Sequence, residues 1–450
     1  MADNRFSFSQ DNLKTIAEDI LKFARKRGAT ACEVDVSEGF GQSVTVRRDE
    51  VDTIEYNRDK GVGVTIYDGQ KRGYASTSDF SKEALKATVD AAVSIARFTA
   101  PDAASGLPHE ALLAKDFPDF DLYHPWKIST EDAIELASRC ERAAFAVSPE
   151  IRNSDGASVS MQESHFISAN SLGFMGGYAS SRHYLSCSVI AGEGDDMQRD
   201  DWYTSKRDPA ELADADEIGT FAARRALARL GARQIPTCEV PVLFEAPVAN
   251  GLLGAYVQAT SGGSLYRKAS FLLDSLGQRI LPEHVDIDED PHIPRGKGSA
   301  PFDDEGVRTL ARKVVERGVV QSYFLSSYSA RKLGLRTTGH AGGSQNLALK
   351  SRHTQPGDDL DAMLRKLGRG LFVTELMGQG VNYVTGDYSR GAAGFWVEGG
   401  RIAFPVHEIT IAGNLKQMFQ DLAAVGADVY TQGSKSSGSV LISRMKLAGS

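Results

Sequence analysis

The chain has 450 residues, of which 41% are apolar and 24% charged, and this length suits two domains of ordinary size. Its 51 basic and 59 acidic residues give a formal net charge of −8, which argues against an extended basic groove for nucleic acid. No run of about 18 apolar residues occurs, so no membrane-spanning helix is expected. The opening segment MADNRFSFSQDNLK lacks the apolar core of a signal peptide. We therefore expect a cytoplasmic protein that binds neither nucleic acid nor membrane.

The first half of the chain alternates helical and strand patterns. Apolar residues recur with helical spacing, and polar residues suited to capping precede several of these segments. The predicted helices cover Ser9–Arg27, Ser81–Phe98, a segment that opens at Ser129, and Asp208 to about Gly231. Strand patterns lie between them, including a single run over residues 41–57, and Asp68-Gly69 predicts a hairpin turn.

The second half is richer in short strands and glycine turns. Two helices are predicted there, in APVANGLLGAYVQATSG and NLKQMFQDLAAVG, and the last strand is SGSVLISRMKLAG. The change of pattern places a domain boundary at Ala232–Pro236. We predict an α+β fold of two domains, with a mixed α/β domain at residues 1–231 and a mainly antiparallel β domain at residues 237–450.

The usual motifs of hydrolytic chemistry are missing or incomplete. A zinc site of the HExxH type needs two histidines one helical turn apart, but neither His109-Glu110 nor His407-Glu408 has the second histidine. A metal site built from scattered histidines stays open as an alternative. No GxSxG elbow, P-loop or GxGxxG is present. The two SxxK matches, at Ser329 and Ser443, are about as many as chance supplies.

Two glycine-rich segments are candidates for contact with a substrate. His340 lies in TTGHAGGS, which is either a substrate-contacting loop or an ordinary exposed loop. Gly378 and Gly380 open a glycine-rich stretch that ends at Gly391. Glycines there either let a bound peptide approach the backbone closely or form turns.

The segment GLLGAYVQA, which begins at Gly251, resembles a signature of the TldD/PmbA metallopeptidase family. Catalytic members have GLLHExxxH at this place, so Gly254 and Ala259 occupy the two histidine positions and Ala255 that of the catalytic glutamate. A third ligand in those members is a cysteine near the C-terminus, whereas no cysteine follows Cys238 here. The DDEG segment, which contains Asp303 and Asp304, matches another family signature, and the resemblance covers nearly the whole chain.

The resemblance implies a non-catalytic subunit of a heterodimeric zinc peptidase. It implies no cofactor on this chain, zinc on a TldD-like partner, and an enclosed chamber for unfolded proteins or peptides such as a microcin precursor or an antitoxin. Residues expected to line the substrate channel are Asp303, Asp304, His340, Gly378 and Gly380. One alternative is a stand-alone homodimeric peptide-binding protein without peptidase activity, and another is an enzyme with a different site.

Overall fold

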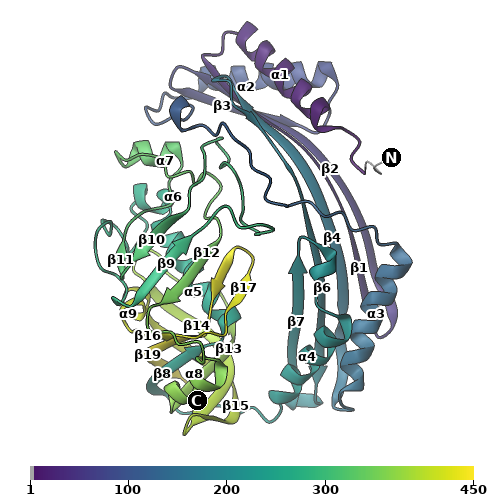
Figure 1. Cartoon of the computed structure of the whole chain (residues 1–450), viewed down its shortest axis with the longest axis vertical. Helices are drawn as coiled ribbons and strands as arrows, with labels where there is room; N and C mark the ends of the chain where they lie inside the picture. Colours follow the sequence, from purple (N-terminus) through teal and green to yellow (C-terminus); the bar gives the residue numbers. More distant parts are fainter. Residues whose placement is uncertain (1–4, 450) are drawn as a thin grey trace. The chain divides into compact units, whose positions relative to one another are not determined.

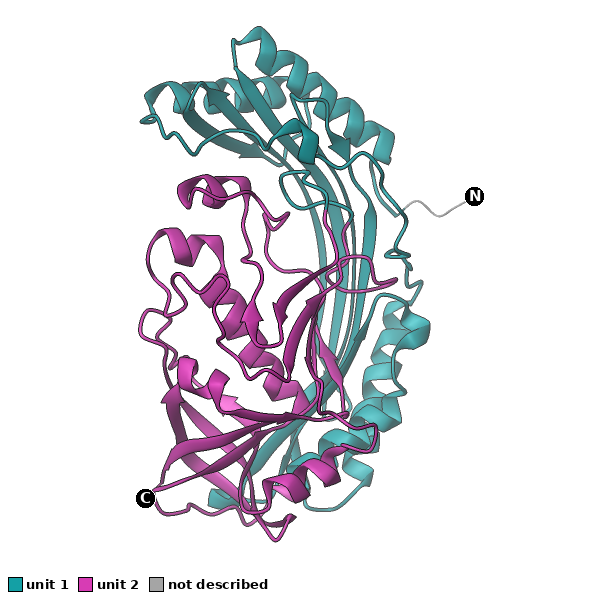
Figure 2. Ribbon diagram, turned by 60° about the vertical axis from the view of Figure 1, so that its left-hand side comes forward, with its two compact units in different colours: residues 1–227, 301–308 teal, residues 228–300, 309–450 magenta. Residues whose placement is uncertain are grey.

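The computed structural model describes residues 5–449, and its chain divides into two compact units (Figures 1 and 2). Unit 1 comprises the residues up to Leu227 together with Pro301–Arg308, and unit 2 comprises Ala228–Ala300 and Thr309–Ser450. The sequence set its boundary at 232–236 and placed residues 301–308 in the second domain, whereas this short segment groups with unit 1. Among the residues described, no helix is both long enough and apolar enough to cross a membrane.

Unit 1 contains a seven-stranded sheet with the order β3-β2-β1-β4-β6-β7, and β5 pairs with β4. Every pairing in this sheet is antiparallel. The strands are β1 Ala31–Arg47, β2 Glu50–Asp68, β3 Lys71–Thr77, β4 Ile151–Asn170, β5 Met175–Gly176, β6 Ala179–Ala191 and β7 Gln198–Lys206.

The β1–β2 connection corrects the predicted strand over residues 41–57. That run contains a two-residue turn at Arg48 and Asp49, whose φ angles are +55° and +61°, and Arg47 pairs with Glu50 across it. Such turns usually contain glycine or asparagine, so the sequence RRDE gives little sign of this one. The turn predicted at Asp68-Gly69 is present, with β3 beginning at Lys71.

Four α-helices belong to the first half of the chain: α1 Gln10–Lys26, α2 Lys82–Phe98, α3 Thr130–Ala146 and α4 Ala215–Ala228. The side chains of Ser9, Ser81 and Ser129 cap the first three, and the start of the third helix at Ser129 agrees with its predicted capping role. Short 3-10 turns cover Glu110–Leu112, Gly194–Asp196 and Pro209–Glu211.

The helix predicted from Asp208 to Gly231 is shorter than expected. Asp208 caps only the 3-10 turn, and α4 begins after Asp214, whose side chain accepts a hydrogen bond from the amide of Asp216 at 2.9 Å. A second capping residue thus restarts the helix several positions later.

The largest hydrophobic cluster of unit 1 lies where α1 and α2 pack on the sheet. It combines one face of each helix with alternate residues of β1, β2 and β4, which is the pattern expected for a half-buried sheet. Its fully buried members include Leu13, Ala17, Val36, Val64, Ile66, Val89 and Ala92.

Unit 2 contains two six-stranded sheets. The first has the order β11-β10-β9-β12-β18-β17, and the second has the order β15-β14-β13-β8-β19-β16 with an extra β15–β19 pairing. Only β12–β18 and β8–β13 are parallel. The strands are β8 Cys238–Phe244, β9 Val285–Glu289, β10 Arg312–Glu316, β11 Val319–Val320, β12 Leu347–Ser351, β13 Gly370–Met377, β14 Asp387–Glu398, β15 Arg401–Asn414, β16 Leu422–Val425, β17 Tyr430–Gln432, β18 Lys435–Ser437 and β19 Val440–Ala448.

The helices of unit 2 are α5 Ala246–Thr260, α6 Gly262–Tyr266, α7 Ser327–Lys332, α8 Leu360–Leu367 and α9 Leu415–Gln420. The segment NLKQMFQDLAAVG is helical only in α9, after which β16 pairs with β19. Helix α5 packs against β17 and β18 of one sheet and β13 of the other. The predicted α+β class, with a mainly antiparallel second half, is confirmed.

Candidate functional site

Helix α5 carries the positions that matter most for metal chemistry. It follows β8 directly, with Pro247 in its first turn, where the missing amide proton of proline costs nothing. Most of its faces are buried; Leu253, Tyr256 and Ala259 are each no more than 2% exposed. The helix is therefore a core element with one accessible strip.

The three positions of the lost motif differ in their surroundings. Gly254 is half-buried, and a Cβ built on it would meet only Cε of Lys435, at 4.0 Å. Ala255 is 5% exposed and Ala259 is fully buried. Five residues turn a regular helix by about 500°, so side chains at 254 and 259 point about 140° apart.

A zinc ion does not fit these residues. Glycine and alanine side chains have no atom that coordinates a metal or moves a proton. Across residues 5–449, no cluster of three or more His, Cys, Asp or Glu side chains is arranged to hold a metal.

His340 lies in the interior of unit 2. Its side chain is 1% exposed, and Nε2 lies 2.9 Å from Oε2 of Glu289. Arg312 donates from Nε to the same oxygen at 2.7 Å, and the Gln345 amide donates to the other Glu289 oxygen at 2.8 Å. The sequence suggested a flexible loop, but the structure shows a buried, hydrogen-bonded cluster.

The electrostatics of this cluster agree with its geometry. Burial raises the pKa of Glu289, but the hydrogen bond and charge of His340 and the charge of Arg312 outweigh it, so the pKa is lowered. The ring of Phe324 lies 5.3 Å from the imidazole of His340 and 6.4 Å from the ring of Tyr256 on α5. The cluster therefore packs against α5 through the ring of Phe324.

Asp303 holds a tight turn in unit 1. Its Oδ1 accepts hydrogen bonds from the amides of Glu305 at 3.0 Å and Val307 at 2.9 Å, and its side chain is buried. Gly306 completes the turn with a φ of +78°, and a Cβ on it would lie 2.7 Å from the ring of Phe174. Two residues of the DDEG segment, Asp303 and Gly306, therefore serve to form this turn.

Acidic side chains crowd around this turn. Partial removal from water and the negative charges of Asp35 and Glu305 raise the pKa of Asp304. Burial and the charge of Glu305 raise the pKa of Glu33 to about 7, although Tyr67 donates a hydrogen bond to Glu33 at 3.1 Å. These carboxyl groups gain protons more easily than carboxyl groups in water.

Gly378 and Gly380 follow β13 in the connection to β14. Gly378 has a φ of +76°, as a turn requires. A Cβ on Gly380 would lie 1.8 Å from the carbonyl oxygen of Ser389, and the Ser389 amide donates to the Gly380 carbonyl at 2.7 Å. The close approach that the sequence suggested is made by the chain's own backbone.

The predicted channel residues belong to different units of the chain. Asp303 and Asp304 belong to unit 1, whereas His340, Gly378 and Gly380 belong to unit 2. Within unit 2, His340 lies under α5 and the two glycines belong to a hairpin of the second sheet.

Sequence reasoning missed Lys435, the residue of β18 nearest to Gly254. The two residues lie far apart in the chain, and no local pattern links them. The hairpin that carries Lys435 is held to α5 by Asn250, whose Nδ2 donates to the Tyr430 carbonyl at 3.1 Å. Lys435 is half-buried.

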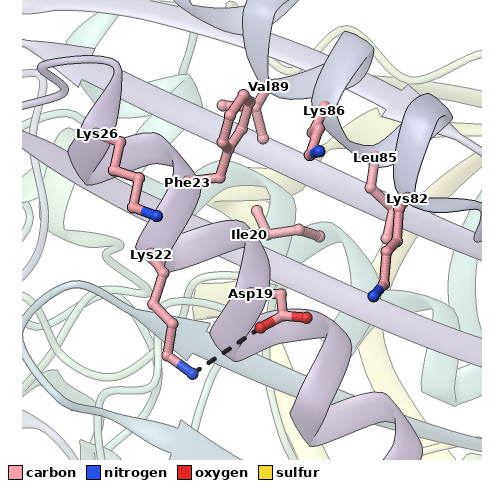
Figure 3. Close-up of a pocket in the computed structure, with 9 residues that line it drawn as sticks. All are labelled: Asp19, Ile20, Lys22, Phe23, Lys26, Lys82, Leu85, Lys86 and Val89. Carbon is pink, nitrogen blue, oxygen red and sulfur yellow. Dashed lines mark ion pairs between the residues drawn. The ribbon is translucent and has the colours of Figure 1, made fainter.

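A separate groove of about 300 Å³ runs between α1 and α2 in unit 1 (Figure 3). Its apolar floor includes Ile20 and Val89, and lysines stand along both helices. The lysines are Lys22 and Lys26 of α1 and Lys82 and Lys86 of α2. Only Lys22 has a carboxylate partner within 4.0 Å among the described residues, so the rim is locally positive.

Comparisons with known proteins agree with the motif analysis. Three family models match: PmbA/TldA metallopeptidase domain 1 at residues 32–96, the central domain at 123–230 and the C-terminal domain at 237–449. Metalloprotease PmbA of Escherichia coli O157:H7 is 48% identical over 93% of this chain and 92% of its own. Haemophilus influenzae has a PmbA homolog that is 45% identical over 98% of this chain and 97% of its own. The same organism has a TldD homolog that is 24% identical over 82% of this chain and 80% of its own.

Solved structures share the fold. A candidate modulator of DNA gyrase from Bacteroides thetaiotaomicron is 27% identical, with a TM-score of 0.92 over 98% of this chain and all of that one. TldE from Thermococcus kodakarensis is 19% identical, with a TM-score of 0.82 over 96% of this chain and all of that one. The chain belongs to the PmbA/TldD metallopeptidase family.

Proposed function

We propose that this chain is the non-catalytic subunit of a zinc peptidase whose metal is held by a TldD-like partner. The observation that carries the proposal is the residue set of α5, in which Gly254, Ala255 and Ala259 supply no metal ligand and no proton-transfer group. The presence of a PmbA homolog and a TldD homolog in Haemophilus influenzae supports a pairing of two chains of this family.

The role of this chain in such a pair is to wall the reaction chamber and hold an extended substrate in the cytoplasm. The substrate class is an unfolded protein or peptide, of which a microcin precursor and a labile antitoxin are examples. Strand addition is one way to hold such a chain, because main-chain hydrogen bonds tolerate varied side chains.

The sheet pairings limit where strand addition can occur in unit 2. Strand β14 is paired on both sides, and β15 pairs with both β14 and β19, so the glycine-rich stretch up to Gly391 is no free edge. The outermost strands of the first sheet are β11 and β17. Of these, β17 lies next to β18 and α5, so we assign peptide capture to that side.

Reconstitution with a TldD-like chain tests the proposal. We expect the isolated chain to hold no stoichiometric zinc and to leave an unstructured peptide intact. The mixture with a TldD-like chain should hold zinc and cleave the peptide in a chelator-sensitive way, faster than that partner alone. Elemental analysis and a peptide-cleavage assay measure both properties.

Two results would contradict the proposal. One tightly held zinc per isolated chain, or cleavage by that chain, would show a site elsewhere. No association with a TldD-like chain, combined with a peptide-binding homodimer in sedimentation experiments, would favour the stand-alone binding protein.

A further inference from the structure

The accessible strip of α5 faces a lysine. A Cβ on Gly251 would meet no atom within 4 Å, and one on Gly254 would meet only Lys435. These two glycines leave the helix backbone open on the side that faces β18. The Lys435 side chain therefore lies beside the place where catalytic relatives carry a metal ligand.

Among residues 5–449, no acidic side chain forms an ion pair with Lys435, although other lysines of unit 2 have such partners. Lys313 and Lys350 both reach Asp288, at 2.7 and 2.9 Å, and Lys366 reaches Asp358 at 2.7 Å. An ammonium group without a carboxylate partner keeps its positive charge and its three hydrogen-bond donors unused by the protein. It is thus prepared to bind an anion.

Neighbouring elements hold the backbone around this lysine. Lys435 pairs in register with Leu347 of β12, and Asn250 ties the hairpin to α5. A basic loop also packs against the preceding residue, because a Cβ on Gly298 would lie 2.8 Å from Cβ of Ser434. That loop, RGKG, also contains Arg295 and Lys297, which have partners of their own.

We propose that Lys435 binds the C-terminal carboxylate of a peptide substrate on the open face of α5. The inference rests on the proposed peptide-holding function. A lysine ammonium has three donors and no acceptor, and its hydrogen bonds to a carboxylate are about twice as strong as neutral ones. The terminal carboxylate is an anion that every unmodified peptide carries whatever its sequence. Lys435 would therefore hold the C-terminal end of the substrate beside the position at which catalytic relatives carry a metal ligand.

Peptide binding tests the inference directly. An N-terminally labelled, unstructured peptide is prepared as the free acid and as the C-terminal amide, and fluorescence anisotropy measures its affinity for the chain and for its complex with a TldD-like partner. We expect the free acid to bind at least about tenfold more tightly than the amide. Lys435→Met should remove this preference, and Lys435→Arg should keep most of it.

A matched control separates this site from general charge. Lys416 is an exposed lysine of α9 without an ion pair in the described structure, so Lys416→Met removes the same charge from the same unit. This variant should keep the preference. An amidated peptide with one internal aspartate shows whether a side-chain carboxylate can substitute. Equal binding of acid and amide by the unmodified chain, or a preserved preference in Lys435→Met, would overturn the inference.

The two proposals fail in different ways. If acid and amide bind equally but the complex still cleaves peptides, only the role of Lys435 is wrong. If neither peptide binds the chain or its complex, both the proposed peptide-holding function and the proposed role of Lys435 are wrong. Circular dichroism of Lys435→Met confirms that the variant is folded before its affinity is compared.

Discussion

At the scale of single residues, the charge of Glu305 in the DDEG segment affects Glu33 and, through the pKa of Glu33, the stability of unit 1. Its carboxyl group is half-buried, with a pKa of about 7 because of burial and the nearby charge of Glu305. The ordinary value is 4.5, so between these pH values the folded chain binds more protons than the unfolded chain. Stability from this group is fully present below about pH 4.5 and is lost as pH rises through about 7.

Replacing this carboxyl group should stabilise the protein under alkaline conditions. We expect Glu33→Gln to unfold at a higher urea concentration than the unmodified chain at pH 8.5, with a smaller difference at pH 5. The amide keeps the shape of the side chain and has no charge to bury. Glu55→Gln, at an exposed position of β2, serves as the control and should show no such trend. A difference that is the same at both pH values would contradict the assignment.

At the scale of elements, α2 begins with an unfavourable charge. Lys82 is the first residue of the helix, directly after the cap Ser81, and the partial positive charge of a helix N-terminus repels a cation there. Lys86 lies four residues on and has the same charge, which also disfavours the helix. Both lysines are exposed on the rim of the groove in Figure 3.

Lys82→Glu should stabilise the protein. The new carboxylate favours the helix N-terminus by about 0.3–1 kcal/mol and pairs with Lys86 in the better order, for about 0.2–0.5 kcal/mol more. We expect a matching rise in the free energy of unfolding, measured with urea. Lys86→Glu is the control, because it changes charge equally but lies beyond the first turn. Equal effects of the two variants would show that helix position does not matter here.

The helices and strands also show which structural features can be predicted from a single sequence. Apolar spacing predicted the helices that begin after Ser9 and Ser81, and the capping pattern at Ser129 predicted the third, because a cap acts through backbone amides a few residues away. The turn at Arg48 and Asp49 was not predicted, because its residues are not typical of turns. The helix predicted at the end of the chain stops after Gln420, where pairing of β16 with β19 overrides local helical preference.

At the scale of the whole molecule, the missed features depend on residues far apart in the chain. His340 meets Glu289 and Arg312, and Gly254 meets Lys435, through tertiary packing alone. Phe302 is a further example. The sequence placed it in the second domain, but its ring packs 5.0 Å from the ring of Phe174 within unit 1. The lack of a metal-binding side chain at positions 254, 255 and 259, by contrast, can be read directly from the sequence.

A catalytic metal site needs ligands from several segments, so restoring one segment should not restore activity. The triple variant Gly254→His, Ala255→Glu and Ala259→His supplies only two imidazoles, whereas catalytic zinc sites usually have three protein ligands and an open position for water. No cysteine follows Cys238, so the late ligand of the relatives is missing, and Lys435 lies at Gly254 instead. The structure has room for a side chain at Gly254, since a Cβ there would meet only Cε of Lys435, at 4.0 Å.

Ala259 is the harder position. It is fully buried, and a larger side chain in a packed core typically costs about 1–3 kcal/mol. We therefore expect Gly254→His alone to fold with nearly unchanged stability, and Ala259→His and the triple variant to be destabilised. With zinc added, the triple variant should leave an unstructured peptide intact. Chelator-sensitive cleavage well above that of the unmodified chain would mean that the rest of unit 2 still forms a competent active site.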